Sequence, residues 1–153
     1  MNWKWLILAL VIGAFCGVIG SAFHIGVHHA TELRAHHPWL LLCLPLAGLG
    51  IVAFYKLVKV EGHGTNNIID AVHFGKGLSI FLLPAIFIGT ILTHLCGGSA
   101  GREGAALQLG GSTASLLART LRLSENDTTV AIMAGMSAVF AGLFGTPLTA
   151  CLF

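Results

Sequence analysis

The sequence predicts an all-α, polytopic membrane protein built from broken and tilted helices. Of its 153 residues, 56% are hydrophobic and only 9% are charged, whereas a soluble globular domain carries about a quarter charged residues. Its 20 glycines suit the close approach of helices in a membrane and would weaken a soluble helical bundle. Charge-free apolar runs recur at residues 5–23, 39–55, 78–94 and 130–153. We therefore expect a multi-pass protein of the cell membrane with no separate soluble domain.

The first segment, residues 3–30, is expected to be a retained membrane helix. Its apolar stretch is too long for the core of a signal peptide and continues into glycines suited to packing. Trp3, Lys4 and Trp5 form a pattern that anchors helices at the membrane interface. The first and last apolar runs are long enough to cross about 30 Å of hydrocarbon, and the two middle runs are marginal.

A histidine-rich connection follows the first segment. It contains His24, His28, His29, His36 and His37. His24 and His28 are one helical turn apart, which is a spacing that can ligate zinc. The chain has no H-E-x-x-H pattern, and its four cysteines form no C-x-x-C pair. We therefore expect a hydrated interfacial loop and no metal or cofactor, with a histidine-dependent metal-ion transporter as an alternative.

The second segment, residues 38–60, leads into a turn over residues 61–67. This turn is expected to open a helix over residues 68–74, which is too short to span a membrane. Gly62 and Gly64 favour a turn, and Thr65 is a candidate N-cap. A helix start with exposed amides can face an anion.

A glycine-rich stretch at residues 97–111 follows the third apolar run. Residues 97–101 hold too many glycines for a stable helix, whereas the sequence from Ala105 onward favours one. The result is a loop of exposed amides that leads into a helix N-terminus, which is an anion-binding arrangement. Placing ionised Arg102 or Glu103 at the bilayer centre would cost at least ~2.5–3.5 kcal/mol of free energy for each side chain. Such residues are therefore expected to have a function there. Short helices interrupted by glycine are typical of transporter binding sites.

The last part of the chain carries clear helix signals. Ser124 and Asp127 have the spacing of an N-terminal cap. Gly145, Thr146 and Pro147 are expected to end that helix, and a further helix begins before Phe153. No linker divides the chain, so residues 1–153 are expected to form one unit.

Three stretches together resemble the CLC anion channels and anion/proton antiporters. Residues 101–104, Gly-Arg-Glu-Gly, resemble the family motif G-[KR]-E-G-P, with Ala105 in place of the proline. Residues 62–66 lie where the family has G-S-G-I-P, and residues 135–148 resemble the helix pair that follows. The resemblance implies that the chain is the N-terminal portion of a CLC-like transmembrane domain whose C-terminal portion is absent.

The resemblance also implies a function and a set of site residues. Glu103 would be the gate and proton carrier, because its carboxylate can occupy the place of the anion until it is protonated. The implied anion-binding residues are Gly62, His63, Gly64, Asn66, Gly101, Arg102, Gly104 and Ala105. His63 and Asn66 replace the serine and proline of the G-S-G-I-P motif, and so resemble the fluoride/proton antiporter branch.

We therefore expect proton-coupled fluoride or chloride antiport in the complete protein, which would be a homodimer in membrane lipid. A CLC chloride channel or antiporter and a non-transporting truncated membrane fragment are the alternatives.

Residues 97–101 match the G-x-S-x-G pattern of hydrolases. No histidine follows His94 and no parallel sheet is expected, so the chain is not expected to be an enzyme. The basic residues lie at segment ends rather than in a patch, so nucleic acid is not an expected partner.

Overall fold

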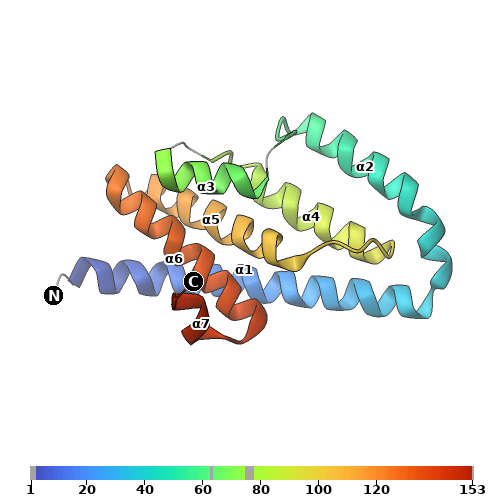
Figure 1. Ribbon diagram of the computed structural model, residues 1–153, viewed down its shortest axis with the longest axis horizontal. Helices are drawn as coiled ribbons and strands as arrows, with labels where there is room; N and C mark the ends of the chain where they lie inside the picture. The colour runs from blue at the N-terminus through green and yellow to red at the C-terminus, as the bar shows by residue number, and fades with distance from the viewer. Residues whose placement is uncertain (1–2, 63, 75–77, 153) are drawn as a thin grey trace.

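The computed structural model describes residues 3–62, 64–74 and 78–152, and within these ranges it contains helices and no strand (Figure 1). In chain order the elements are α1 (Trp3–His36), the 3-10 helix η1 (Pro38–Cys43), α2 (Leu44–Leu57), α3 (Thr65–Phe74), α4 (Leu82–Leu95), α5 (Arg102–Thr120), α6 (Glu125–Phe144) and α7 (Pro147–Leu152). The predicted all-α class is confirmed.

Helix α1 is longer than predicted. It runs for 34 residues, which is about 50 Å at 1.5 Å per residue. The prediction of a loop at the histidines is wrong, because the helix continues through His36. No glycine or proline interrupts residues 27–37, so nothing in this stretch breaks the helix. It ends just before Pro38, which disfavours helical backbone at the residue that precedes it.

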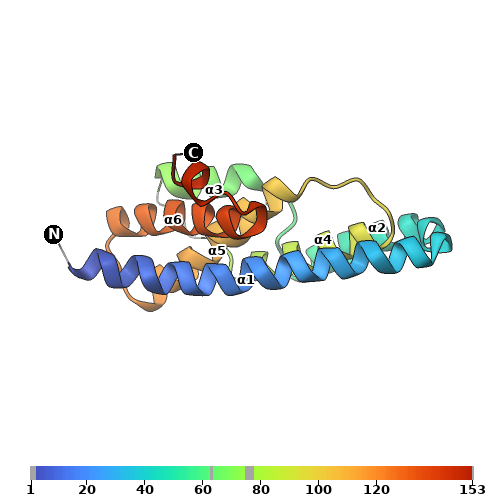
Figure 2. The ribbon, with the colours of Figure 1, turned by 90° about the horizontal axis from the view of Figure 1, so that it is seen from below.

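Helices α5 and α6 pack backbone to backbone at two glycines. A Cβ atom on Gly110 would collide with the Gly135 carbonyl oxygen, and one on Gly135 would lie 2.5 Å from the Ala114 Cβ. Helix α1 lies against both of them (Figure 2). Its Cys16 Sγ is 4.0 Å from the Gly110 carbonyl oxygen, and its Gly20 faces Val139. These small residues allow three helix backbones to approach closely, as in other membrane helix bundles.

The described helices have the lengths and surfaces of a membrane protein. Three spans are long and apolar enough, by length and composition, to cross a membrane: Trp3–His36, Pro38–Leu57 and Glu125–Phe144. Helix α4 is apolar but shorter. Large apolar side chains are exposed on several helices, including Leu10, Leu46, Leu57 and Leu148. Such surface is unusual on a soluble monomer and suits contact with lipid.

The residues predicted to begin and end the last helices are confirmed in these roles. The Ser124 hydroxyl accepts a hydrogen bond from the Asp127 backbone N–H at 3.2 Å, so Ser124 caps α6 as predicted. Gly145 ends α6 in the left-handed region at φ 67°, where glycine has no steric penalty. Pro147 then begins α7, which confirms the predicted break.

Candidate anion site at two helix starts

Helices α3 and α5 begin close together near the middle of the molecule and run toward the same end (Figure 1). The Gln108 side-chain Nε2 of α5 donates a hydrogen bond to Thr65 Oγ1 of α3 at 3.0 Å. A Cβ atom on Gly104 would lie 3.3 Å from the same Thr65 oxygen. The glycine thus lets the first turn of α5 approach the first residue of α3.

Helix α5 begins at Arg102, three residues earlier than predicted. Glu103, Gly104 and Ala105 therefore lie in its first turn rather than in the preceding loop. Gly101 is the N-cap, with extended backbone at φ −66° and ψ 139°, and no side chain caps the helix. The first backbone N–H groups of a helix have no partner within it, so this helix start carries uncapped donors and a partial positive charge.

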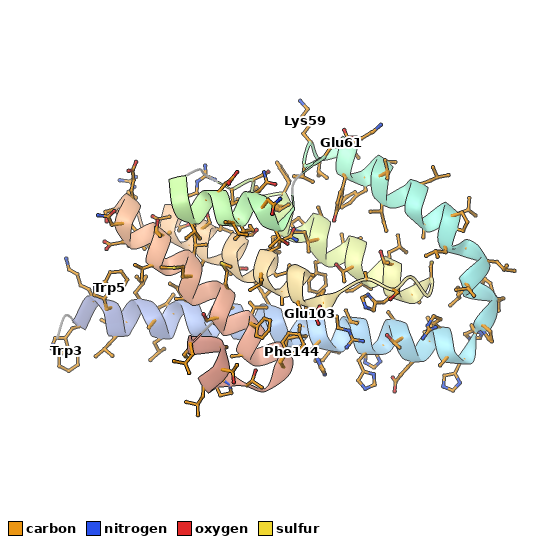
Figure 3. All side chains as sticks on the ribbon, viewed as in Figure 1. Trp3, Trp5, Lys59, Glu61, Glu103 and Phe144 are labelled. Carbon is orange, nitrogen blue, oxygen red and sulfur yellow. The ribbon has the colours of Figure 1, made fainter. Side chains whose placement is uncertain are left out.

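The Glu103 side chain is exposed at this helix start, near the middle of the long axis of the molecule (Figure 3). Its Oε2 lies 3.0 Å from the position that a Cβ atom on Gly101 would occupy. The carboxylate therefore folds back over the N-cap, where the glycine leaves room for it. Within the described part of the chain, Glu103 makes no ion pair. A carboxylate at this place is stabilised by the helix dipole.

The turn before α3 is closed by two hydrogen bonds between Gly64 and Asn67. Gly62 has φ +74°, a conformation that favours glycine. The Gly64 backbone N–H donates to Asn67 Oδ1 at 2.9 Å, and the Asn67 N–H donates to the Gly64 carbonyl oxygen at 3.0 Å. Gly64 is therefore the residue that precedes the helix, and its amide is engaged. The predicted N-cap role of Thr65 is wrong, because Thr65 is the first residue of α3 and its hydroxyl accepts from Gln108.

The structure brings some of the predicted site residues together and leaves others apart. Gly101, Glu103, Gly104 and Ala105 share one helix start, and Ala105 is buried. Gly62 is exposed in the turn before α3, and Asn66 is exposed in the first turn of α3. His63 lies outside the described residues. Arg102 is half-buried and lines a separate cavity with Arg34 and His94.

Sequence reasoning did not assign Gln108 and Thr65 to the site. The available signal was a single amide side chain in the apolar stretch that follows Arg102 and Glu103, and an amide needs a hydrogen-bond partner when it is buried. Its partner could not be identified from the sequence, because the two residues are 43 positions apart.

The histidines of α1 form no metal centre in the part of the chain that the structure describes. No group of three or more His, Cys, Asp or Glu side chains there could hold a metal ion. Glu32 Oε2 instead lies 3.7 Å from His28 Nδ1 and 3.6 Å from His29 Nδ1, and all three side chains are exposed.

Comparison with known proteins gives consistent matches. The family model described as voltage gated chloride channel matches residues 48–153. A chloride/fluoride channel protein of Pseudomonas syringae pv. tomato is 42% identical over 98% of this chain and 34% of its own length. An H+/Cl− exchange transporter of Vibrio campbellii is 26% identical over 97% of this chain and 35% of its own length. This chain thus spans about a third of the length of these relatives.

A solved structure shares the fold. The crystal structure of a CLC-type fluoride/proton antiporter superposes with a TM-score of 0.87 at 34% sequence identity. The match covers 98% of this chain and 40% of the other.

Proposed function

Because this chain belongs to the voltage-gated chloride channel (CLC) family, we propose that it forms part of a proton-coupled anion antiporter of the cell membrane with its anion site at the starts of α3 and α5. The observation that carries this proposal is the uncapped first turn of α5, which holds Glu103 beside the start of α3. Membership of a family of channels and transporters also supports transport rather than enzymatic catalysis.

The chemistry of the site couples anion movement to protonation. Uncapped N–H groups and the dipole of α5 replace part of the hydration shell of a small anion. Ionised Glu103 competes for the same donors and closes the path. Protonated Glu103 is neutral, so it no longer competes with the anion for these donors, and it swings aside. The Gly101–Glu103 geometry supports this role, because the absence of a side chain at residue 101 leaves the carboxylate room to move.

We propose fluoride as the preferred anion and chloride as the alternative. Two of the matched proteins carry fluoride in their names, one of them as a fluoride/proton antiporter. His63 and Asn66 stand where chloride-selective members have serine and proline. Fluoride is small and strongly hydrated, and a strong donor such as an imidazole N–H or an amide compensates its dehydration better than a weaker contact. The complete assembly is proposed to be a homodimer in lipid.

A chimera tests the proposal directly. Residues 1–153 replace the matching segment of the Pseudomonas syringae relative, and the purified protein is reconstituted in liposomes loaded with fluoride or chloride. An anion electrode and a pH electrode record efflux and proton movement. We expect saturable fluoride efflux accompanied by proton movement in the opposite direction.

The unaltered relative is the positive control, and residues 1–153 alone are the negative control. We expect residues 1–153 alone to insert without selective flux. A chimera that inserts and assembles like the relative, but moves no anion, would overturn the proposed function and support a non-transporting chain.

A further inference from the structure

We propose that the chain holds a second anion-binding site, for a hydrated halide, in a polar cavity beside the start of α5. This cavity, called the Gly97 cavity below, has a volume of about 370 Å³. Its lining residues are Thr31 and Arg34 of α1, His94 of α4, Gly97, Gly98, Ser99 and Ala100 of the following loop, and Arg102 of α5. The proposal rests on the proposed function only in placing this site next to a transport path.

The lining of the Gly97 cavity is positive. Arg34 and Arg102 are both half-buried there, and no carboxylate is among the lining residues. Neither arginine makes an ion pair in the described part of the chain. The nearest acidic residue on α1, Glu32, lies instead beside His28 and His29. Two guanidinium groups that share a cavity without a counter-charge create a positive potential that concentrates anions.

Arg34 is held in position by packing against the loop. A Cβ atom on Gly97 would lie 3.1 Å from Arg34 Cδ and 2.8 Å from Leu41 Cδ1. Gly97 has φ +80°, so the loop needs glycine here both for its backbone conformation and for this close approach. The Arg34 stem therefore lies across the loop with its charge at the cavity. A positioned guanidinium loses less freedom when it binds than a mobile one.

Side chains supply most of the free donors in this cavity. The N–H groups of Gly97, Gly98 and Ala100 already donate to the carbonyl oxygens of His94, Thr93 and Gly98. This distinguishes the Gly97 cavity from the start of α5, where backbone donors are uncapped. The cavity is also far larger than a bare halide, so the anion keeps much of its water and is bound partly through it.

His94 makes the site sensitive to pH. Its Nδ1 lies 2.8 Å from the Thr90 carbonyl oxygen, and because a carbonyl only accepts, Nδ1 must carry the hydrogen. In neutral His94 the other nitrogen, Nε2, then has a lone pair that repels an anion. Protonation turns Nε2 into a donor and adds a third positive charge to those of Arg34 and Arg102. Anion binding is therefore expected to be stronger when His94 is protonated than when it is neutral.

The test measures binding without transport. The isotope-labelled chain in detergent micelles is titrated with sodium fluoride or sodium chloride at constant ionic strength, and the backbone amide signals are followed by NMR. We expect saturable shifts at residues 97–100, with tighter binding at about pH 5.5 than at about pH 8. Arg34→Gln should weaken binding about tenfold, whereas Arg34→Lys retains the charge and most of the affinity.

Two further variants separate the site from general charge effects. Arg122→Gln removes the same charge at the other end of α5 and should leave binding unchanged. His94→Gln should abolish the pH dependence. The proposal is overturned if residues 97–100 show no saturable shift in the parent, if Arg34→Gln binds as tightly as the parent, or if the pH dependence persists in His94→Gln. Shifts confined to residues 101–105 would also overturn it, yet would leave the proposed Glu103 site intact.

Discussion

The Gln108 side-chain amide donates a hydrogen bond to the Thr65 hydroxyl at 3.0 Å and so joins α5 to α3 across 43 positions of sequence. Thr65 is the first residue of α3, and Gly104 approaches the same hydroxyl from the first turn of α5. One oxygen atom thus contacts both of the helix starts that we propose for the anion site.

Replacing either partner of this bond should destabilise the chain. We expect Gln108→Leu and Thr65→Val each to lower the free energy of unfolding by about 0.5–1.5 kcal/mol, and a double-mutant cycle to show coupling of about 0.6 kcal/mol or more, in the range of membrane hydrogen bonds. Reversible denaturation in mixed micelles measures these values. Thr120→Val is the matched control, because Thr120 Oγ1 bonds only within its own helix, to the Leu116 carbonyl oxygen. Additive effects of the two substitutions on the free energy of unfolding would contradict the hydrogen bond between Gln108 and Thr65.

Glu103→Gln should separate anion flux from proton movement in the chimera described above. The substituted side chain has nearly the same shape but cannot be deprotonated, so we expect anion efflux to continue while proton movement is lost. Glu125→Gln is the matched control, because Glu125 is also an exposed glutamate in the first turn of a helix. It should leave both fluxes unchanged. Proton movement that stays proportional to anion flux in Glu103→Gln would disprove the gate.

Adding a methyl group between α5 and α6 should be strongly destabilising. Gly110→Ala would place its Cβ against the Gly135 backbone, which has no flexible end that could move aside. We expect Gly110→Ala and Gly135→Ala to lower the free energy of unfolding by about 1–3 kcal/mol. Gly142→Ala, also in α6, has nothing within 4 Å of the new methyl group and should be neutral or stabilising by up to about 1 kcal/mol. Thermal or denaturant unfolding distinguishes these outcomes, and equal effects at the three positions would refute the close packing.

The identity of residue 63 should affect which anion is preferred. We expect the chimera to prefer fluoride over chloride and His63→Ser to reduce that preference, because a hydroxyl is a weaker donor to a strongly hydrated ion than an imidazole N–H. His37→Ser, at an exposed position just after α1, is the control. Efflux of both anions under identical gradients gives the ratio. A chimera that prefers chloride, or a ratio that is the same in both proteins, would show that residue 63 has no such role.

The sequence alone determined the class of this protein and both ends of α6. The charge-free runs predict membrane helices, because ionised groups are costly in hydrocarbon. Ser124 and Gly145 mark the two ends of α6, because capping and left-handed backbone depend on residues within about one turn. The position of Glu103 at a helix start follows from the same kind of local pattern, a run of glycines before a good helix former.

Tertiary structure decided which of these local features meet. Threonine is a residue type that is favoured at N-caps, yet the Thr65 hydroxyl accepts a hydrogen bond from Gln108 of a different helix. The Asn67 side chain closes the turn instead, by accepting from the Gly64 N–H. The Gly97 cavity likewise joins Arg34 of α1 to His94 and Arg102, which lie much further along the chain. Such contacts depend on which helix faces are buried together and on where glycines allow close approach. Those are properties of the packed molecule, because the signals that define a single helix extend over only a few residues and do not specify its neighbours.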